Sequence, residues 1–124
     1  MLFLSDVTAG MEEVLESILR QAVQTKKISL LRIRFHPADD RTRYDQLIKE
    51  YGRVIKIEKS AEKDIVKDLA RVGVIIGVET VAMVVSCLVG KQTISIKQAG
   101  RKSGLPFPKI IRVGSARSAF QSIK

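Results

Sequence analysis

The residues best suited to hold a phosphate-bearing ligand lie between positions 77 and 81. An apolar run ends at Gly77, and Thr80 directly precedes a second apolar run that begins at Val81. A strand that turns into a helix in this way aims the first helix amides and the threonine hydroxyl at an anion. A glycine at the turn lets the backbone approach a ligand closely. The turn is therefore a candidate phosphate site, and a threonine that only caps its helix is the alternative.

Other residues could complete such a site. His36, the only histidine, follows an apolar segment and could donate a hydrogen bond to a phosphate, with Arg34 adding positive charge. Lys97 and Arg101 lie in a basic loop and could clamp a diphosphate, or could simply be solvated. Glu79 would repel a phosphate, so its candidate role is to accept a hydrogen bond from a sugar or ribose hydroxyl, or else to face solvent.

Several common chemistries lack their residues in this chain. The single histidine and the single cysteine, Cys87, provide no multi-histidine metal site and no intramolecular disulfide. Cys87 lies in an apolar segment, which favours a small buried side chain over a reactive thiolate. The sequence contains no GxGxxG, GxxxxGK[ST], CxxC, HExxH or GxSxG pattern. We therefore predict no cofactor and no metal, and we assign no catalytic residue.

Alternating strand-like and helix-like segments must position these residues. Apolar residues at helical spacing predict a helix over 11–25. Capping residues predict further helices from Asp39 or Asp40 to 51, from Ser60 to 71, over 81–89, and from Ser115 to the end of the chain. Short apolar or β-branched runs predict strands at 2–5, 28–35, 54–58, 74–77, 93–96 and 110–113.

This alternation predicts one three-layer, Rossmann-like α/β domain over residues 1–124, with a mainly parallel, doubly wound sheet. In a Rossmann-like strand order the first and fourth strands flank the point at which the order reverses, and ligands bind there. The turns that follow these two strands are residues 6–10 and 77–80. Arg32 and Arg34 on one strand face predict a strand near the sheet edge, or one whose end opens on a site.

Composition bounds the class of protein. The chain has 22 Lys and Arg against 13 Asp and Glu, a net charge of +9, which favours nucleic acid, anionic membranes or phosphate-bearing ligands. No apolar run reaches the roughly 18–20 residues that span a bilayer, so no transmembrane segment is predicted. The acidic start of the chain and the lone cysteine favour a cytoplasmic location.

Two segments resemble glycosyltransferases. Arg34-Phe35-His36-Pro37 resembles the R-x-H-P element of bacterial capsule and surface-polysaccharide glycosyltransferases. The segment VGVIIGVETVAMVVSCLVGKQTISIKQAG resembles the nucleotide-sugar-binding segment of GT-B glycosyltransferases and UDP-N-acetylglucosamine 2-epimerases. The resemblance implies that His36 contacts the donor phosphate and that Thr80, with the amides after it, holds a diphosphate. The helix acid of these families falls at Val85 here, and their proline after Gly-Lys falls at Gln92.

The resemblance also implies a partner, because GT-B enzymes use a second Rossmann-like domain for the acceptor. We therefore expect a domain that binds a nucleotide-diphosphate or nucleotide-monophosphate sugar, docked on a partner subunit or belonging to a longer enzyme, and peripheral at a membrane through that partner. A basic module that binds nucleic acid or an acidic protein is one alternative, although an aromatic content of 5% leaves few stacking platforms. A non-catalytic structural domain that forms homo-oligomers is another.

Overall fold

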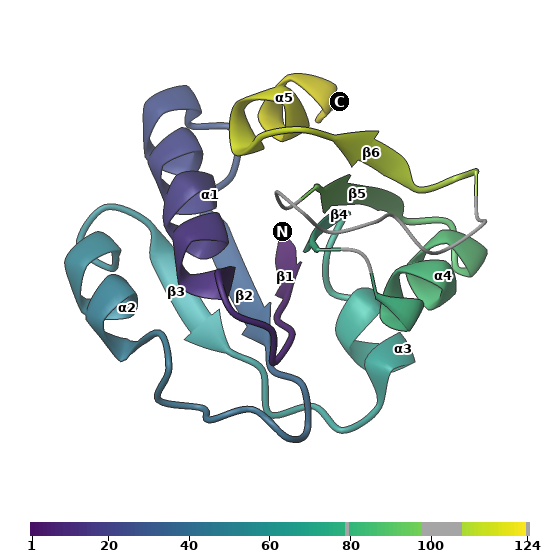
Figure 1. Ribbon diagram of the computed structural model, residues 1–124, viewed down its shortest axis with the longest axis horizontal. Helices are drawn as coiled ribbons and strands as arrows, with labels where there is room; N and C mark the ends of the chain where they lie inside the picture. Colours follow the sequence, from purple (N-terminus) through teal and green to yellow (C-terminus); the bar gives the residue numbers. More distant parts are fainter. Residues whose placement is uncertain (79, 98–107, 124) are drawn as a thin grey trace.

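The computed structural model describes residues 1–78, 80–97 and 108–123 of the 124-residue chain. Six parallel strands in these residues form one sheet with the order β3-β2-β1-β4-β5-β6 (Figure 1). The strands are β1 Leu2–Leu4, β2 Leu30–Arg34, β3 Lys56–Lys59, β4 Val74–Gly77, β5 Gln92–Ile96 and β6 Ile111–Val113. The predicted Rossmann-like, parallel α/β fold is therefore confirmed.

The helices divide between the two faces of this sheet. They are α1 Met11–Thr25, α2 Asp45–Tyr51, α3 Ile65–Leu69, α4 Val81–Leu88 and α5 Ala116–Ser122. Side chains of α1, α2 and α5 join the core on one face, and side chains of α3 and α4 join a second core on the other. Figure 1 shows α3 and α4 side by side, away from α1. The helices thus form the two outer layers of a three-layer sandwich.

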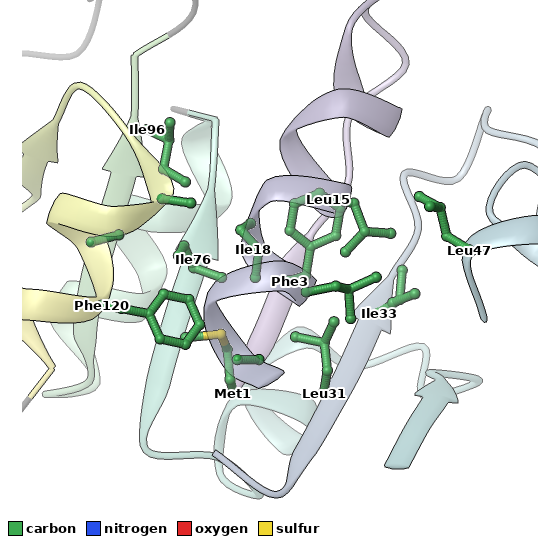
Figure 2. Packing of buried hydrophobic residues seen from close by; sticks show 14 of the residues in the cluster. Met1, Phe3, Leu15, Ile18, Leu31, Ile33, Leu47, Ile76, Ile96 and Phe120 are labelled. Atoms are coloured by element: carbon green, nitrogen blue, oxygen red, sulfur yellow. The ribbon is translucent and has the colours of Figure 1, made fainter. Parts of the chain in front are cut away.

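The larger core lies beneath α1 and α5. Figure 2 shows Phe3 and Ile33 from the sheet facing Leu15 and Ile18 of α1, with Phe120 of α5 beside them. All five side chains are at most 1% exposed. Neighbouring residues of a strand point to opposite faces, so this face takes alternate residues of the strands. Burial on both faces explains the nearly continuous apolar runs of β1 and β4.

The core beneath α3 and α4 is smaller. It combines the other strand face, including Leu2, Leu4 and Ile75, with Leu69 of α3 and Met83 of α4. Cys87 of α4 also belongs to this core and is a buried, free thiol, as predicted. None of the helices in the described residues is both long enough and apolar enough to cross a membrane.

Two predicted helix starts are wrong. The helix expected from Ser60 begins at Ile65, because Asp64 caps it by accepting a hydrogen bond from the Val66 amide at 2.9 Å. The helix expected from Asp39 or Asp40 begins at Asp45. Ser60 instead donates to the Asp68 carboxylate, and Asp39 accepts from the Ser5 hydroxyl. The start at Ser115 is confirmed, since its hydroxyl accepts from the Ser118 amide at 3.1 Å.

Candidate functional site

The strand order reverses between β1 and β4. The chain passes from β1 outward to β2 and β3, and then returns to β4 on the other side of β1. Leu4 pairs with Gly77 at the carboxyl ends of these two strands. In open parallel sheets this reversal is where ligands bind. The expectation that the first and fourth strands flank the reversal is therefore confirmed.

Thr80 lies at this position, at the start of α4. It is the N-cap residue of α4 and has extended backbone angles, but its side chain makes no capping hydrogen bond. Its Oγ1 is buried, and among the described residues it has no hydrogen-bond partner. The next residue, Val81, has an exposed side chain, so only its amide could serve a ligand at this helix end. The Met83 amide already donates to the Thr80 carbonyl oxygen at 3.0 Å, so the Thr80 hydroxyl and the first two amides of α4 are the candidate ligand contacts.

Gly77 has a structural role in the sheet. A Cβ atom at this position would lie 2.7 Å from the Leu4 carbonyl oxygen, closer than real Cβ contacts come. The close approach of β1 and β4 therefore accounts for this glycine without a ligand.

Lys97 and His36 lie at the carboxyl ends of the strands, on either side of Thr80. Lys97 follows β5, the neighbour of β4, and its exposed side chain has no ion pair within the part of the chain that the structure describes. His36 follows β2, and its Nδ1 accepts a hydrogen bond from the Ala38 amide at 3.1 Å. Because Nδ1 is an acceptor, Nε2 is the nitrogen left to donate to a ligand. Both side chains could therefore contact a ligand at this end of the sheet. His36 is separated from Thr80 by β1.

Arg34 is held inside the protein instead. Its Nη1 donates to Asp68 Oδ2 at 2.9 Å and to the Glu62 carbonyl at 2.7 Å. Its neighbour on the same strand face, Arg32, donates from Nε to Asp68 Oδ1 and from Nη1 to Glu58, both at 2.6 Å. The charge of Arg34 is therefore compensated by Asp68 and does not support His36.

We call Arg32, Arg34, Glu58, Ser60 and Asp68 the Asp68 network. Asp68 is fully buried, and the Ser60 hydroxyl donates to it at 2.5 Å. Burial alone would raise the pKa of the Asp68 carboxyl, but the hydrogen bonds from Ser60, Arg32 and Arg34 hold this pKa below its ordinary value. The network ties α3 to β2 and to the end of β3. The two arginines thus indicate a buried ion pair on the second strand from the edge.

A second polar cluster follows β1 and β2. Tyr44 is fully buried, with its ring 6.1 Å from that of Phe3, and its hydroxyl lies 2.6 Å from Ser5 Oγ. Ser5 Oγ also donates to Asp39 Oδ2 at 3.1 Å. We call Ser5, Asp39 and Tyr44 the Tyr44 cluster. Burial raises the pKa of the Tyr44 phenol, with the Ser5 hydrogen bond opposing that shift.

Arg43 anchors the loop between β1 and α1 to this cluster. Its guanidinium donates to the carbonyl oxygens of Asp6 at 2.7 Å and Thr8 at 2.8 Å, and it pairs with Glu12 at 2.6 Å. It also contacts Asp39 at 3.2 Å. The hydrogen bond to Glu12 raises the pKa of Arg43, and the same bond lowers the pKa of the Glu12 carboxyl. One loop beside the strand reversal is thus fixed by charged contacts.

Sequence reasoning missed both polar clusters. The signals for the Asp68 network were Arg32 and Arg34 on one strand face and an acid next to Leu69 on the buried side of a helix. The Tyr44 cluster had no local signal beyond the polar Ser5 directly after a strand. Two predicted site residues, Glu79 and Arg101, lie outside the residues that the structure describes.

The structure therefore brings Thr80, Val81, Gly77 and Lys97 to neighbouring strand ends and withdraws Arg34. Within the described ranges, no group of three or more His, Cys, Asp or Glu residues could hold a metal ion. Comparisons of the chain with protein families, with curated proteins and with solved structures found no significant match.

Proposed function

We propose that the carboxyl ends of β1 and β4 bind the phosphate groups of a nucleotide sugar. The observation that carries this proposal is the buried Thr80 hydroxyl, which has no hydrogen-bond partner in the described part of the chain. Buried polar groups are nearly always satisfied, so an orphaned hydroxyl at a helix N-terminus calls for an acceptor. A phosphate oxygen would accept from Thr80 and from the first amides of α4.

The neighbouring cations support an extended ligand. Lys97 lies one strand from Thr80, where its ammonium could meet a second phosphate. The strand that leads to His36 lies two strand spacings from β4, about 10 Å. One phosphate group would not contact both Thr80 and His36, whereas a nucleotide sugar is long enough to do so. This breadth favours a nucleotide sugar over inorganic phosphate.

In this role the chain supplies the donor-binding half of a glycosyltransferase. The acceptor and the catalytic base would come from a partner domain, as the resemblance to GT-B enzymes implies. Nucleic-acid binding has less support, because the guanidinium groups of Arg32, Arg34 and Arg43 form ion pairs with carboxylates of the same chain. No observation specifically favours that alternative beyond the net charge.

Calorimetric titration with UDP, CDP and CMP sugars tests the proposal, with inorganic phosphate and free sugar as comparison ligands. We expect a nucleotide sugar to bind and Thr80→Val to weaken its affinity about tenfold, the usual value of one hydrogen bond to a charged group. Lys97→Gln should weaken it by a smaller factor.

Ser115→Ala is the matched control. Ser115 also caps a helix after a parallel strand, but its hydroxyl is satisfied by the Ser118 amide. Its loss should leave nucleotide-sugar affinity unchanged. Absence of binding by the folded protein at millimolar nucleotide sugar would contradict the proposal, and so would equal affinities for Thr80→Val and the unmodified protein.

A further inference from the structure

The outer face of α4 is apolar and exposed. The side chains that this helix buries against the sheet are Met83, Ser86 and Cys87. Away from that side, Val81 and Leu88 are each 71% exposed, and Val84 between them is half-buried. The helix contains no charged residue. A helix that is apolar all round is normally covered on every side, so this face is a candidate contact surface.

Basic residues accompany this apolar face. Helix α3 contacts α4 on the same side of the sheet, and it exposes Val66 and Lys67, with Arg71 exposed just beyond its end. Lys91 follows α4, and Asp64 is the exposed acid that caps α3. The asymmetry extends along the sequence. Residues 60–124 contain 11 Lys and Arg against 4 Asp and Glu, whereas residues 1–59 contain 11 against 9.

We infer that the outer face of α3 and α4 binds an anionic membrane surface. Val81 and Leu88 would enter the headgroup and acyl boundary, and Lys67, Arg71 and Lys91 would meet the lipid phosphates. Exposed apolar side chains with Lys and Arg beside them are the combination that holds proteins at such an interface. Each Lys or Arg near an anionic leaflet adds attraction that is lost at high salt. The inference does not depend on the proposed phosphate site.

Charge complementarity selects this occupant. A second copy of the chain would bring two strongly basic halves together, and like charges oppose that contact. An anionic bilayer offers both an apolar interior for the valines and leucine and negative charge for the bases around them. An acidic protein would offer the negative charge but not the apolar interior. Binding to vesicles with no other protein present distinguishes the two partners.

Co-sedimentation of the purified protein with vesicles tests the inference. We expect it to bind vesicles of phosphatidylcholine mixed with phosphatidylserine, and to bind phosphatidylcholine alone much less. Leu88→Ser should lower the partition coefficient about tenfold, because a buried leucine contributes more than that factor to transfer from water. Leu88 is chosen because Val81 also lends its amide to the candidate phosphate site.

Matched controls separate this face from the rest of the molecule. Val54→Ser removes a valine that is 68% exposed in the connection between α2 and β3, and it should leave binding unchanged. Lys67→Glu should weaken binding about tenfold through two units of charge. Lys49→Glu on α2 makes the same change on the other face of the sheet and should have little effect.

Three results would overturn the inference. The first is that folded, monomeric protein does not bind vesicles containing phosphatidylserine. The second is that Val54→Ser and Leu88→Ser weaken binding equally. The third is a concentration-dependent dimer, measured by light scattering without vesicles, that Leu88→Ser abolishes, since a second copy would then be the occupant of this face.

Discussion

The two faces of the sheet are built from different chemistry. Under α1, α2 and α5 the buried residues are apolar apart from the hydroxyls of Ser5 and Tyr44, and the aromatic rings of Phe3 and Phe120 fill the space between layers. Under α3 and α4 an apolar centre adjoins the Asp68 network on β2 and β3 and two buried hydroxyl residues, Thr93 and Ser95, on β5. The first face supplies hydrophobic stability. The second combines stability with polar groups. It carries the exposed face of α4 and the Thr80 hydroxyl, which has no partner among the described residues.

The largest expected effect lies in the apolar face. Phe3→Ala should lower the free energy of unfolding by about 4 kcal/mol, because it removes a fully buried ring from the core and leaves a cavity. Urea unfolding measures the loss. Val54→Ala changes a largely exposed side chain and should cost less than about 0.5 kcal/mol. Similar losses for both variants would mean that the core is not packed around Phe3.

The next largest effect is expected when the charge of Asp68 is removed from the second face. Asp68→Asn should lower the free energy of unfolding by about 3 kcal/mol, because Arg32 and Arg34 would keep their charge beside a neutral partner. Asp45→Asn breaks the exposed pair with Lys59 and should cost about 1 kcal/mol or less. Equal costs would show that burial adds nothing to the Asp68 network.

The stability difference between the unmodified protein and Asp68→Asn should depend on pH. The pKa of Asp68 is lower in the folded chain than its ordinary value of about 3.9. Its stabilising contribution is therefore complete above that ordinary value and is lost as the pH falls through the lower, folded pKa. The stability difference between the unmodified protein and Asp68→Asn should shrink over that acidic range. Urea unfolding at a series of pH values measures it, and a constant difference would contradict this assignment.

The smallest effects compare two hydroxyls on the polar face. Ser60→Ala removes a donor to the buried Asp68 carboxylate and should cost about 1.5 kcal/mol. Thr80→Val removes a hydroxyl that has no partner in the described residues, so the free energy of unfolding should stay the same or rise slightly. Thermal unfolding without ligand distinguishes them. A clear destabilisation by Thr80→Val would reveal an internal partner for that hydroxyl and weaken the phosphate proposal.

The contrast between the faces also explains what could be predicted from the sequence. Apolar periodicity located α1 over residues 11–25 and the strands that face it, because burial of a regular face leaves a local pattern. The polar face depends on partners far apart in the chain, such as Arg32 with Asp68, and no local pattern pairs them. Ser60 looked like a helix cap because serine hydroxyls satisfy helix amides, but here the buried Asp68 carboxylate takes its hydrogen bond.

At the candidate site, the positions of residues could be predicted where the strand topology decides them, whereas their binding role stays a prediction. Thr80 and Lys97 reach neighbouring strand ends because the crossovers of a parallel sheet return every strand in the same direction. Arg34 does not support His36, because a strand residue near a carboxyl end can point to either face and Arg34 points to the face that contacts Asp68 of α3. Gly77 was assigned to a ligand although the neighbouring strand already requires it.

The pairing of β1 with β4 has a consequence for how the protein folds. It joins residues 2–4 to residues 75–77, a greater separation along the chain than in any other strand pair of the sheet. Closing so long a loop is entropically costly, so this contact is expected to form late, after the more local pairs on either side. The turn at Thr80 takes its place over β1 only once that contact exists. A ligand would therefore bind there only after the whole sheet has formed. When refolding is monitored by ligand binding, the signal should recover more slowly than when it is monitored by helix content.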